Sequence, residues 1–213
     1  MTAPARNAET TRETRETRIR VAIRLDGPAG AQARTGLPFL DHMLESFAVH
    51  GRFGLEVQAS GDVQVDPHHL VEDCGIVLGT AVALALGEVR GIRRAGYFGF
   101  PMDGSLVLAA VDLCGRPNLV WNVPVGTQPL GGIEPGLFRD FFKGLADGLR
   151  ATIHVNAPYR DNDHHAIEAA FKSFGRALRD AVTPTGDESV PSTKGTIGMR
   201  NASNAECGMG NAE

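Results

Sequence analysis

A His-His-x-x-Glu motif that occurs twice constrains this chain more than any other feature. The first copy consists of His68, His69 and Glu72, and the second, 96 positions later, of His164, His165 and Glu168. An apolar stretch follows each copy, so each motif is expected to open a helix. The first His and the Glu would then share one helix face, whereas the second His projects about 100° around the axis. The two histidines of a copy are therefore expected to face different centres, which predicts a paired-metal site.

A weaker repeat surrounds the two motifs. Residues 39–57 align with residues 137–155 at an offset of 98 with matched apolar positions, and the order strand, helix, strand, loop, His-His helix recurs. We therefore predict an internally duplicated α/β (α+β) fold with half-repeats at 15–95 and 96–183. Each half would be a small sheet covered on one side by two helices, with the helices of the two halves packed together.

The remaining segments are expected to be less regular. Residues 1–14 are polar without a buried period, so we predict a mobile N-terminus. The glycine-rich stretches 27–36 and 88–104 read as connections between elements. Beyond Val182 the chain becomes rich in Gly, Ser and Asn, and residues 198–213 are predicted to be a disordered tail. Residues 184–197 are set apart because they contain the sequence Ser-Thr-Lys-Gly.

Composition and charge argue against several classes of protein. A formal net charge of −4 over 213 residues gives no reason to expect a nucleic-acid partner. The N-terminus lacks the apolar core of a secretory signal, and the most apolar stretch, 75–89, is too short and glycine-rich to span a bilayer. Three scattered cysteines do not form a disulfide framework and favour a reducing compartment. We predict a cytoplasmic protein that binds neither nucleic acid nor membrane.

Two further histidines would complete a set of metal ligands. His42 lies beside the apolar stripe of a predicted helix, and His154 lies in a predicted strand before the second motif. With the motif histidines they give six imidazoles, three per metal, with one Glu for each metal. Such ligation suits Zn, Mn, Fe or Ni, and ligand identity alone does not choose among them. A lone copy of the motif would favour a structural role, but two copies in corresponding places favour metal binding.

Two carboxylates and several cations are the other candidates for chemistry. Glu16 and Asp103 precede predicted strands in equivalent places of the two halves. Each cation alone reads as a surface charge, but together they suffice to bind a phosphate, because guanidinium forks and ammonium groups both suit phosphate oxygens. The candidates are Arg94, Arg116, Lys172 and Lys194, with Ser192 as a hydroxyl donor. No glycine-rich phosphate loop of Walker or Rossmann type occurs.

Several long stretches resemble, in the right order, the imidazoleglycerol-phosphate dehydratase family of histidine biosynthesis. They are TGLPFLDHMLESFAVHG, GDVQVDPHHLVED, PMD, DLCGRPNL, DHHAIEAAFKSFGRALRDA and PSTKG, between about residues 15 and 195. The resemblance implies two four-stranded sheets, each backed by two helices, of the ribosomal S5 domain 2-like type. It implies a homo-oligomer of 24 subunits assembled around Mn²⁺ sites at subunit interfaces. It also implies a hydro-lyase that converts D-erythro-imidazoleglycerol phosphate to imidazoleacetol phosphate and water.

The resemblance further implies a role for each candidate residue. The ligands of two Mn²⁺ ions per active site would be His42, His68, His69, Glu72, His154, His164, His165 and Glu168. Glu16 and Asp103 would face the substrate, and Arg94, Arg116, Lys172, Ser192 and Lys194 would hold its phosphate. Two metals on the imidazole nitrogens can stabilise an imidazolate that expels the adjacent hydroxyl. Glu16 is the main candidate acid or base, with Glu168 or Glu72 as ligands that also move protons.

Two departures from the family pattern and two alternatives remain. Gly104 follows Pro-Met-Asp where family members often have Glu, and Ser46 stands where they often have Gln. Both positions bear on substrate contacts.

A paired-metal hydrolase is one alternative, because paired metals with carboxylates also activate water, although the chain lacks Asp-rich ligation. The other is a non-catalytic assembly protein whose metal ligands only join subunits.

Overall fold

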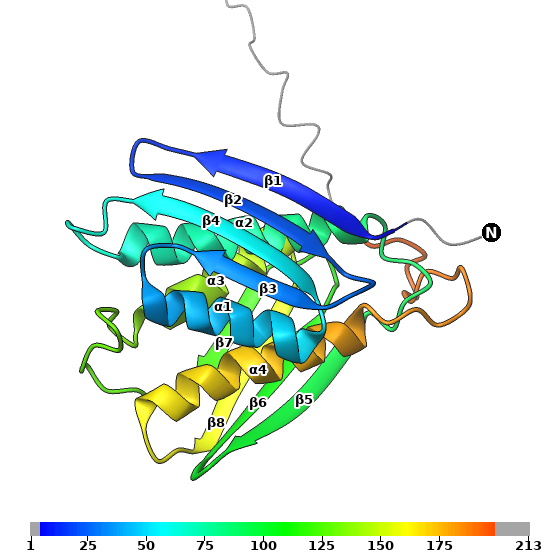
Figure 1. Ribbon diagram of the computed structural model, residues 1–213. Coiled ribbons are helices and arrows are strands. Elements are labelled where there is room, and N and C mark those ends of the chain that lie inside the picture. The colour runs from blue at the N-terminus through cyan, green and yellow to red at the C-terminus, as the bar shows by residue number, and fades with distance from the viewer. Residues whose placement is uncertain (1–4, 199–213) are drawn as a thin grey trace, which may run out of the picture.

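The computed structural model describes residues 5–198, and these form two four-stranded sheets with four helices between them (Figure 1). The first half contains β1 (Asn7–Glu13), β2 (Thr17–Arg24), β3 (Gly30–Arg34), α1 (Pro38–Gly51), β4 (Gly54–Gly61) and α2 (His68–Leu86). The second half contains β5 (Ala95–Met102), β6 (Ser105–Asp112), β7 (Asn118–Asn122), α3 (Leu137–Leu149), β8 (Thr152–Tyr159) and α4 (Asp163–Ala181). The strand orders β1-β2-β4-β3 and β5-β6-β8-β7 are equivalent, which confirms the predicted duplication.

Both sheets are mixed and share one pattern of pairing. Three strands of each sheet run antiparallel, and the fourth, β3 or β7, joins β4 or β8 in parallel. Alternate side chains of each strand face the helices, because successive residues point to opposite faces of a sheet. In β2, Ile19, Val21 and Ile23 are buried, while Arg18 and Arg24 are exposed on the outer face. The alternation in the sequence therefore predicted this strand correctly.

The helices of the two halves pack against each other as predicted, with α2 against α3 and α1 against α4. Glycines allow the helix backbones to approach closely. A Cβ atom added to Gly75 of α2 would lie 2.1 Å from the backbone oxygen of Phe141 in α3. One added to Gly175 of α4 would lie 2.4 Å from the backbone oxygen of Phe47 in α1. At both crossings only glycine fits without moving a helix.

α2 is the one helix in the described part of the chain that is long and apolar enough to cross a membrane by length and composition. Most of its most apolar stretch is buried inside the protein. It packs against α3 on one side and against β1 and β2 of its own sheet on another. A helix covered on several sides needs apolar residues around most of its circumference, so core packing accounts for its composition.

The prediction of a mobile N-terminus is wrong for residues 7–13, which form β1. This strand pairs antiparallel with β2 along its whole length, from Asn7 opposite Arg24 to Glu13 opposite Arg18. Its inward face carries no large apolar side chain, so the sequence gives no periodic signal. Arg12 instead donates a 2.5 Å hydrogen bond to the buried Asp73 of α2. This polar contact docks the strand onto the helix layer.

Both glycine-rich stretches that read as connections also contain strands. Residues 27–36 include β3, and residues 88–104 include β5. Glycine disfavours strands locally, but β4 and β6 supply hydrogen-bonding edges that impose the extended conformation. The predicted tail, 198–213, lies outside the described residues except for Gly198, as do residues 1–4.

Candidate active site

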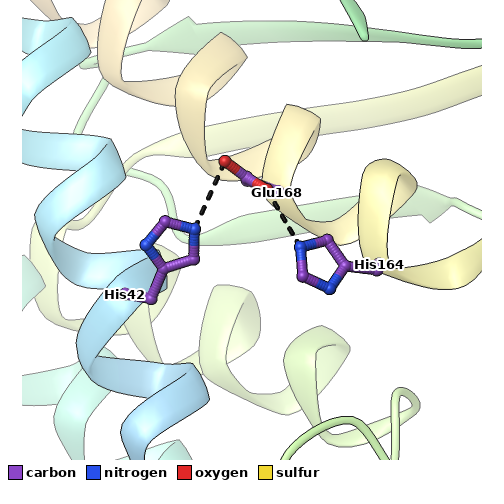
Figure 2. A group of neighbouring side chains, drawn as sticks. All are labelled: His42, His164 and Glu168. Atoms are coloured by element: carbon purple, nitrogen blue, oxygen red, sulfur yellow. Dashed lines mark hydrogen bonds and ion pairs between the residues drawn. The ribbon is translucent and has the colours of Figure 1, made fainter. Parts of the chain in front are cut away.

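His42, His164 and Glu168 meet between α1 and α4 (Figure 2). Glu168 Oε1 lies 3.3 Å from His42 Nε2, and Glu168 Oε2 lies 3.1 Å from His164 Nε2. One candidate ligand atom from each residue lies within 4.8 Å of the other two. His164 and Glu168 share a face because they are four residues apart near the start of α4, and α1 brings His42 from the other half. Two imidazoles and a carboxylate form a donor set that could hold a divalent metal ion.

Glu168 is a buried carboxylate that its neighbours keep ionised. Its side chain is 8% exposed, and Lys172 Nζ, one turn further along α4, lies 2.8 Å from Oε1. Burial alone would raise the pKa of Glu168, but the hydrogen bond and charge of Lys172, with His42 and His164 nearby, hold that pKa below its ordinary value. The carboxylate is therefore ready to bind a cation without first releasing a proton.

The first motif copy makes a looser counterpart between α2 and α3. His68 Nε2 lies 3.6 Å from Glu72 Oε2, and His68 Nδ1 lies 3.6 Å from Asp140 Oδ2. Asp140 occupies in α3 the place that His42 occupies in α1, at the repeat offset of 98. The Glu72 side chain is 41% exposed. This cluster has one imidazole fewer, and its glutamate is far more exposed than Glu168. Asp140 was not among the residues predicted from the sequence, although the aligned repeat pairs it with His42.

The second histidine of each motif faces the end of a neighbouring strand instead of these clusters. His69 Nδ1 lies 3.7 Å from Glu16 Oε2, and His165 Nε2 lies 3.6 Å from Asp103 Oδ2. The rings of the two adjacent histidines are inclined by 74° in the first copy and 88° in the second. Each motif therefore presents its two histidines to different groups, and Glu16 and Asp103 occupy corresponding places.

Two carboxylates that were not predicted from the sequence support these second histidines. Asp62 Oδ2 lies 3.3 Å from His69 Nδ1, and the hydrogen bond between them raises the pKa of His69. Asp161 Oδ2 lies 3.0 Å from His165 Nδ1. The hydrogen bond from Ser105 Oγ, followed by that from His165, holds the pKa of Asp161 far below its ordinary value. An acidic residue in the loop before each motif was the available sequence signal.

Four of the predicted phosphate-binding residues line one cavity of about 550 Å³: Arg94, Arg116, Ser192 and Lys194. Arg94 makes a two-pronged ion pair with Asp112, at 2.7 and 2.9 Å. It also donates a 2.6 Å hydrogen bond to the backbone oxygen of Pro191. This bond and the backbone hydrogen bonds of Gly91 with Thr185 and Ser189 hold the segment 184–197 in place, and Ser192 and Lys194 line the cavity. Three cationic side chains and a hydroxyl form a suitable lining for a phosphate.

Comparisons with known proteins identify the family. Residues 35–178 match the family model described as imidazoleglycerol-phosphate dehydratase. This chain belongs to the imidazoleglycerol-phosphate dehydratase family. The dehydratase of Cereibacter sphaeroides is 47% identical over 194 residues, which cover 90% of this chain and 100% of that protein. The chain is accordingly a dehydratase of histidine biosynthesis.

Solved structures of family members share its fold. The dehydratase of Pyrococcus furiosus superposes with a TM-score of 0.75 at 40% identity and covers 88% of this chain and 100% of its own. The dehydratase of Staphylococcus aureus gives a TM-score of 0.73 at 33% identity, over 84% of this chain and 99% of its own. The predicted architecture of two four-stranded sheets, each with two helices, is confirmed.

A single dehydratase chain does not bring Lys172 to the other predicted phosphate ligands. Lys172 Nζ lies 4.0 Å from Met102 Sδ, at the end of β5. Arg94 immediately precedes Ala95, at the start of the same strand. Seven residue steps of an extended strand span roughly 20 Å. One phosphate group cannot bridge that distance, so Lys172 and the cavity around Arg94 are separate within one copy.

His154 also lies apart from both histidine clusters of this dehydratase. Its neighbours in β8, Ile153 and Val155, are buried beneath the helices. Strand alternation therefore sends the His154 side chain to the outer face of the sheet, where it is exposed. Of the predicted ligands, one chain brings together His42, His164 and Glu168 and leaves His154 on an outer surface.

Proposed function

We propose that the chain converts D-erythro-imidazoleglycerol phosphate to imidazoleacetol phosphate and water in the cytoplasm, with two Mn²⁺ ions per active site. The cluster of His42, His164 and Glu168, in a chain of this family, carries the proposal. Its imidazole nitrogens and ionised carboxylate are a mixed donor set that Mn²⁺ accepts. The adjacent cation Lys172 and the cavity around Arg94 suit a phosphorylated substrate.

The proposed division of labour follows the position of each side chain. The metal ions would be held by His42, His68, His69, Glu72, His154, His164, His165 and Glu168. When bound, the ions supply Lewis-acid stabilisation of negative charge on the substrate imidazole. We assign the proton transfer from the substrate carbon to Glu16, whose carboxylate lies 3.7 Å from His69 and is exposed. Glu72 and Glu168 are assigned as ligands that also assist proton transfer.

The remaining predicted residues are assigned to binding. Asp103 lies beside His165 as Glu16 lies beside His69, and we assign it to the substrate hydroxyls. The phosphate is assigned to the cavity lined by Arg94, Arg116, Ser192 and Lys194, with Lys172 contributed by another copy of the chain. The separation of roughly 20 Å along β5 supports this division between copies. Asp112 would partly neutralise Arg94 until the phosphate binds.

A complete site would then require several subunits, and we propose the 24-subunit homo-oligomer that the family resemblance implies. The outward position of His154 supports this proposal, because a ligand on the outer face of a sheet can serve only a neighbouring copy's metal. His68 and Glu72 have one imidazole fewer than the cluster at Glu168, and both side chains are exposed enough to meet a ligand from another copy. Native mass measurement before and after chelation tests the assembly and its dependence on metal.

The experiment that tests the function is turnover of imidazoleglycerol phosphate by chelator-stripped protein, before and after addition of Mn²⁺. We expect activity only with the metal, and formation of imidazoleacetol phosphate. Release of inorganic phosphate from simple phosphoesters would favour a paired-metal hydrolase instead. A protein that binds Mn²⁺ and assembles, but is silent in both states, would favour a non-catalytic assembly protein. In that case Glu16→Gln and Lys172→Ala should change nothing measurable.

A further inference from the structure

We propose that Asp161 is a positioning residue for His165 and that Gly104 makes room for its carboxylate. The inference rests on the proposed function, in which His165 is a metal ligand. In this role Asp161 accepts a hydrogen bond from His165 Nδ1–H and fixes the ring so that Nε2 faces Asp103. Carboxylates that hold the far nitrogen of a ligand histidine fix both its tautomer and its direction.

The Asp161 carboxylate is held by its own donors, independently of His165. Ser105 Oγ donates to Oδ1 at 2.6 Å, and the backbone N–H of Asn162 donates to the same oxygen at 2.8 Å. The backbone N–H of Gly104 lies 3.4 Å from Oδ2. The backbone N–H of Asp161 in turn donates to Ser105 Oγ at 3.1 Å. These bonds tie the loop before α4 to the start of β6, so the carboxylate is fixed by two separate parts of the chain.

The geometry around His165 assigns its tautomer. Nδ1 lies 3.1 Å from Asp161 Oδ1 and 3.0 Å from Oδ2, whereas Nε2 lies 3.6 Å from Asp103. The amide nitrogen of Asn162 also lies 2.8 Å from Nδ1, because its side-chain oxygen caps α4 by accepting from the His165 backbone N–H. A charged acceptor makes a stronger hydrogen bond than a neutral amide donor. We therefore assign the proton to Nδ1, which leaves the lone pair of Nε2 for a metal.

Gly104 makes this arrangement possible. A Cβ atom at position 104 would lie 2.9 Å from Asp161 Cβ and 3.2 Å from Asp161 Cγ. Any side chain there would push the Asp161 carboxylate away from Ser105 and His165. The backbone of Gly104 is not in the left-handed region, so steric space rather than conformational freedom requires glycine. The departure from the family pattern at this position thus has a structural reason.

The first half supports its second histidine less firmly. Asp62 Oδ2 contacts His69 Nδ1 at 3.3 Å, but within the described residues the buried Asp62 Oδ1 has no hydrogen-bond partner. Asp161, in contrast, has donors on both oxygens. The more firmly held ring, that of His165, therefore belongs to the same motif as His164 and Glu168.

The test is the affinity of the full-length protein for Mn²⁺, measured by chelator competition in the Asp161→Asn variant. Asparagine keeps the shape and can still accept from Ser105, but it removes the charge that holds Nδ1–H. We expect affinity roughly 10–100-fold weaker, the usual cost of losing an outer-shell carboxylate. The matched control is Asp163→Asn at the first residue of α4, where the carboxylate pairs with Arg160 and accepts from the Gly126 backbone N–H instead of contacting a histidine. Its affinity should stay within about twofold of wild type.

Gly104→Ala provides a second, independent route to the same result. It should weaken Mn²⁺ binding by displacing the Asp161 side chain, and its effect should not add to that of Asp161→Asn, because both act through one contact. Thermal unfolding of the metal-free protein identifies variants that simply fail to fold.

The outcomes separate this inference from the proposed function. Wild-type Mn²⁺ affinity in folded Asp161→Asn overturns the positioning role alone, provided that the wild type binds the ion and turns over substrate. Additive effects of the two substitutions also overturn it. A wild type that binds no Mn²⁺ overturns the proposed function and this inference together.

Discussion

The clusters at the two helix pairs show how one scaffold can hold chemically different groups. Between α1 and α4 the motif's Glu168 is buried with His42, His164 and Lys172 around it. Between α2 and α3 the equivalent Glu72 is exposed and has His68 beside it. Two differences at aligned positions account for most of the contrast: α3 carries Asp140 in place of His42, and α2 carries Ile76 in place of Lys172.

The two halves thus share their backbone fold more closely than the side chains at the two clusters. The strand order recurs in both halves, and a close glycine contact recurs at both helix crossings between the halves. The ligand sets do not. The buried Glu168, paired with Lys172 and flanked by two imidazoles, is a prearranged candidate cation ligand, whereas the more exposed Glu72 has one imidazole beside it. The helix pair α1–α4 would thus supply a more complete ligand set than the pair α2–α3, although each pair draws on both halves.

The largest expected effect comes from removing either motif carboxylate. Glu168→Gln and Glu72→Gln should each lower kcat/KM by more than about 100-fold. Loss of a residue that only supports a metal ligand costs up to roughly 100-fold, and these two residues are proposed to be ligands themselves. They should differ in the metal-free protein. Glu168→Gln leaves the largely buried Lys172 ammonium without its counter-charge and should cost roughly 1–3 kcal/mol of unfolding free energy. Glu72→Gln should change the unfolding free energy by no more than about 0.5 kcal/mol. Urea unfolding of both variants measures these changes in unfolding free energy. Equal changes in the two variants would contradict the contrast between Glu168 and Glu72.

The two carboxylates beside the second histidines should affect the reaction without removing the metal. Glu16→Gln should lower kcat by roughly 100- to 10,000-fold with Mn²⁺ still bound, because it removes the assigned proton acceptor. Asp103→Asn should act mainly on KM, because it removes a substrate contact. Steady-state kinetics of both variants with Mn²⁺ present checks this division. Near-full turnover by Glu16→Gln would eliminate the role assigned to Glu16.

The smallest expected effect concerns ion pairs at the open ends of the hairpins. Arg6 pairs with Asp26 beside β1, much as Arg94 pairs with Asp112 beside β5. The hydrogen bond from Arg6 lowers the pKa of Asp26 in the folded protein. The stabilisation is therefore present above the unfolded-state pKa of about 4 and is lost as pH falls through the lower folded-state value. Because the pair is partly exposed, Asp26→Asn should cost at most about 1 kcal/mol at pH 7.

Urea unfolding at pH 7 and at pH 3 measures the difference in unfolding free energy between the wild type and Asp26→Asn. This difference should shrink at the lower pH. A loss that grows on acidification would contradict the sign of the pKa shift. Asp112→Asn provides the matched variant in the second half. It should also change KM for the phosphorylated substrate, because its partner Arg94 lines the candidate phosphate cavity, whereas Asp26→Asn should leave KM unchanged.

The sequence predicted the elements whose cause is local. Both motifs open helices, and the spacing of four placed His164 beside Glu168. β1 was missed because Arg12 docks onto Asp73, a contact between residues 61 positions apart that leaves no periodic pattern. Such a contact is set by tertiary packing, which propensity does not encode.

The candidate site was predictable in its residue types but only partly in its geometry. The aligned repeat could have exposed Asp140 as the counterpart of His42. Asp161 depends on Ser105, 56 positions away, and on the space at Gly104, so no spacing rule identifies it. His154 was predicted to join the other ligands, yet strand alternation in β8 sends it to the outer face. Only another subunit could return it to a metal site.

The most direct test of this account is the number of Mn²⁺ ions bound per chain, counted by titration of the chelator-stripped protein. The paired motifs predict two ions per chain in the wild type, and no more than one at the same affinity in Glu168→Gln. One ion or none in the wild type, or two ions bound with unchanged affinity in Glu168→Gln, would contradict the claim that the duplicated motifs build a paired-metal site.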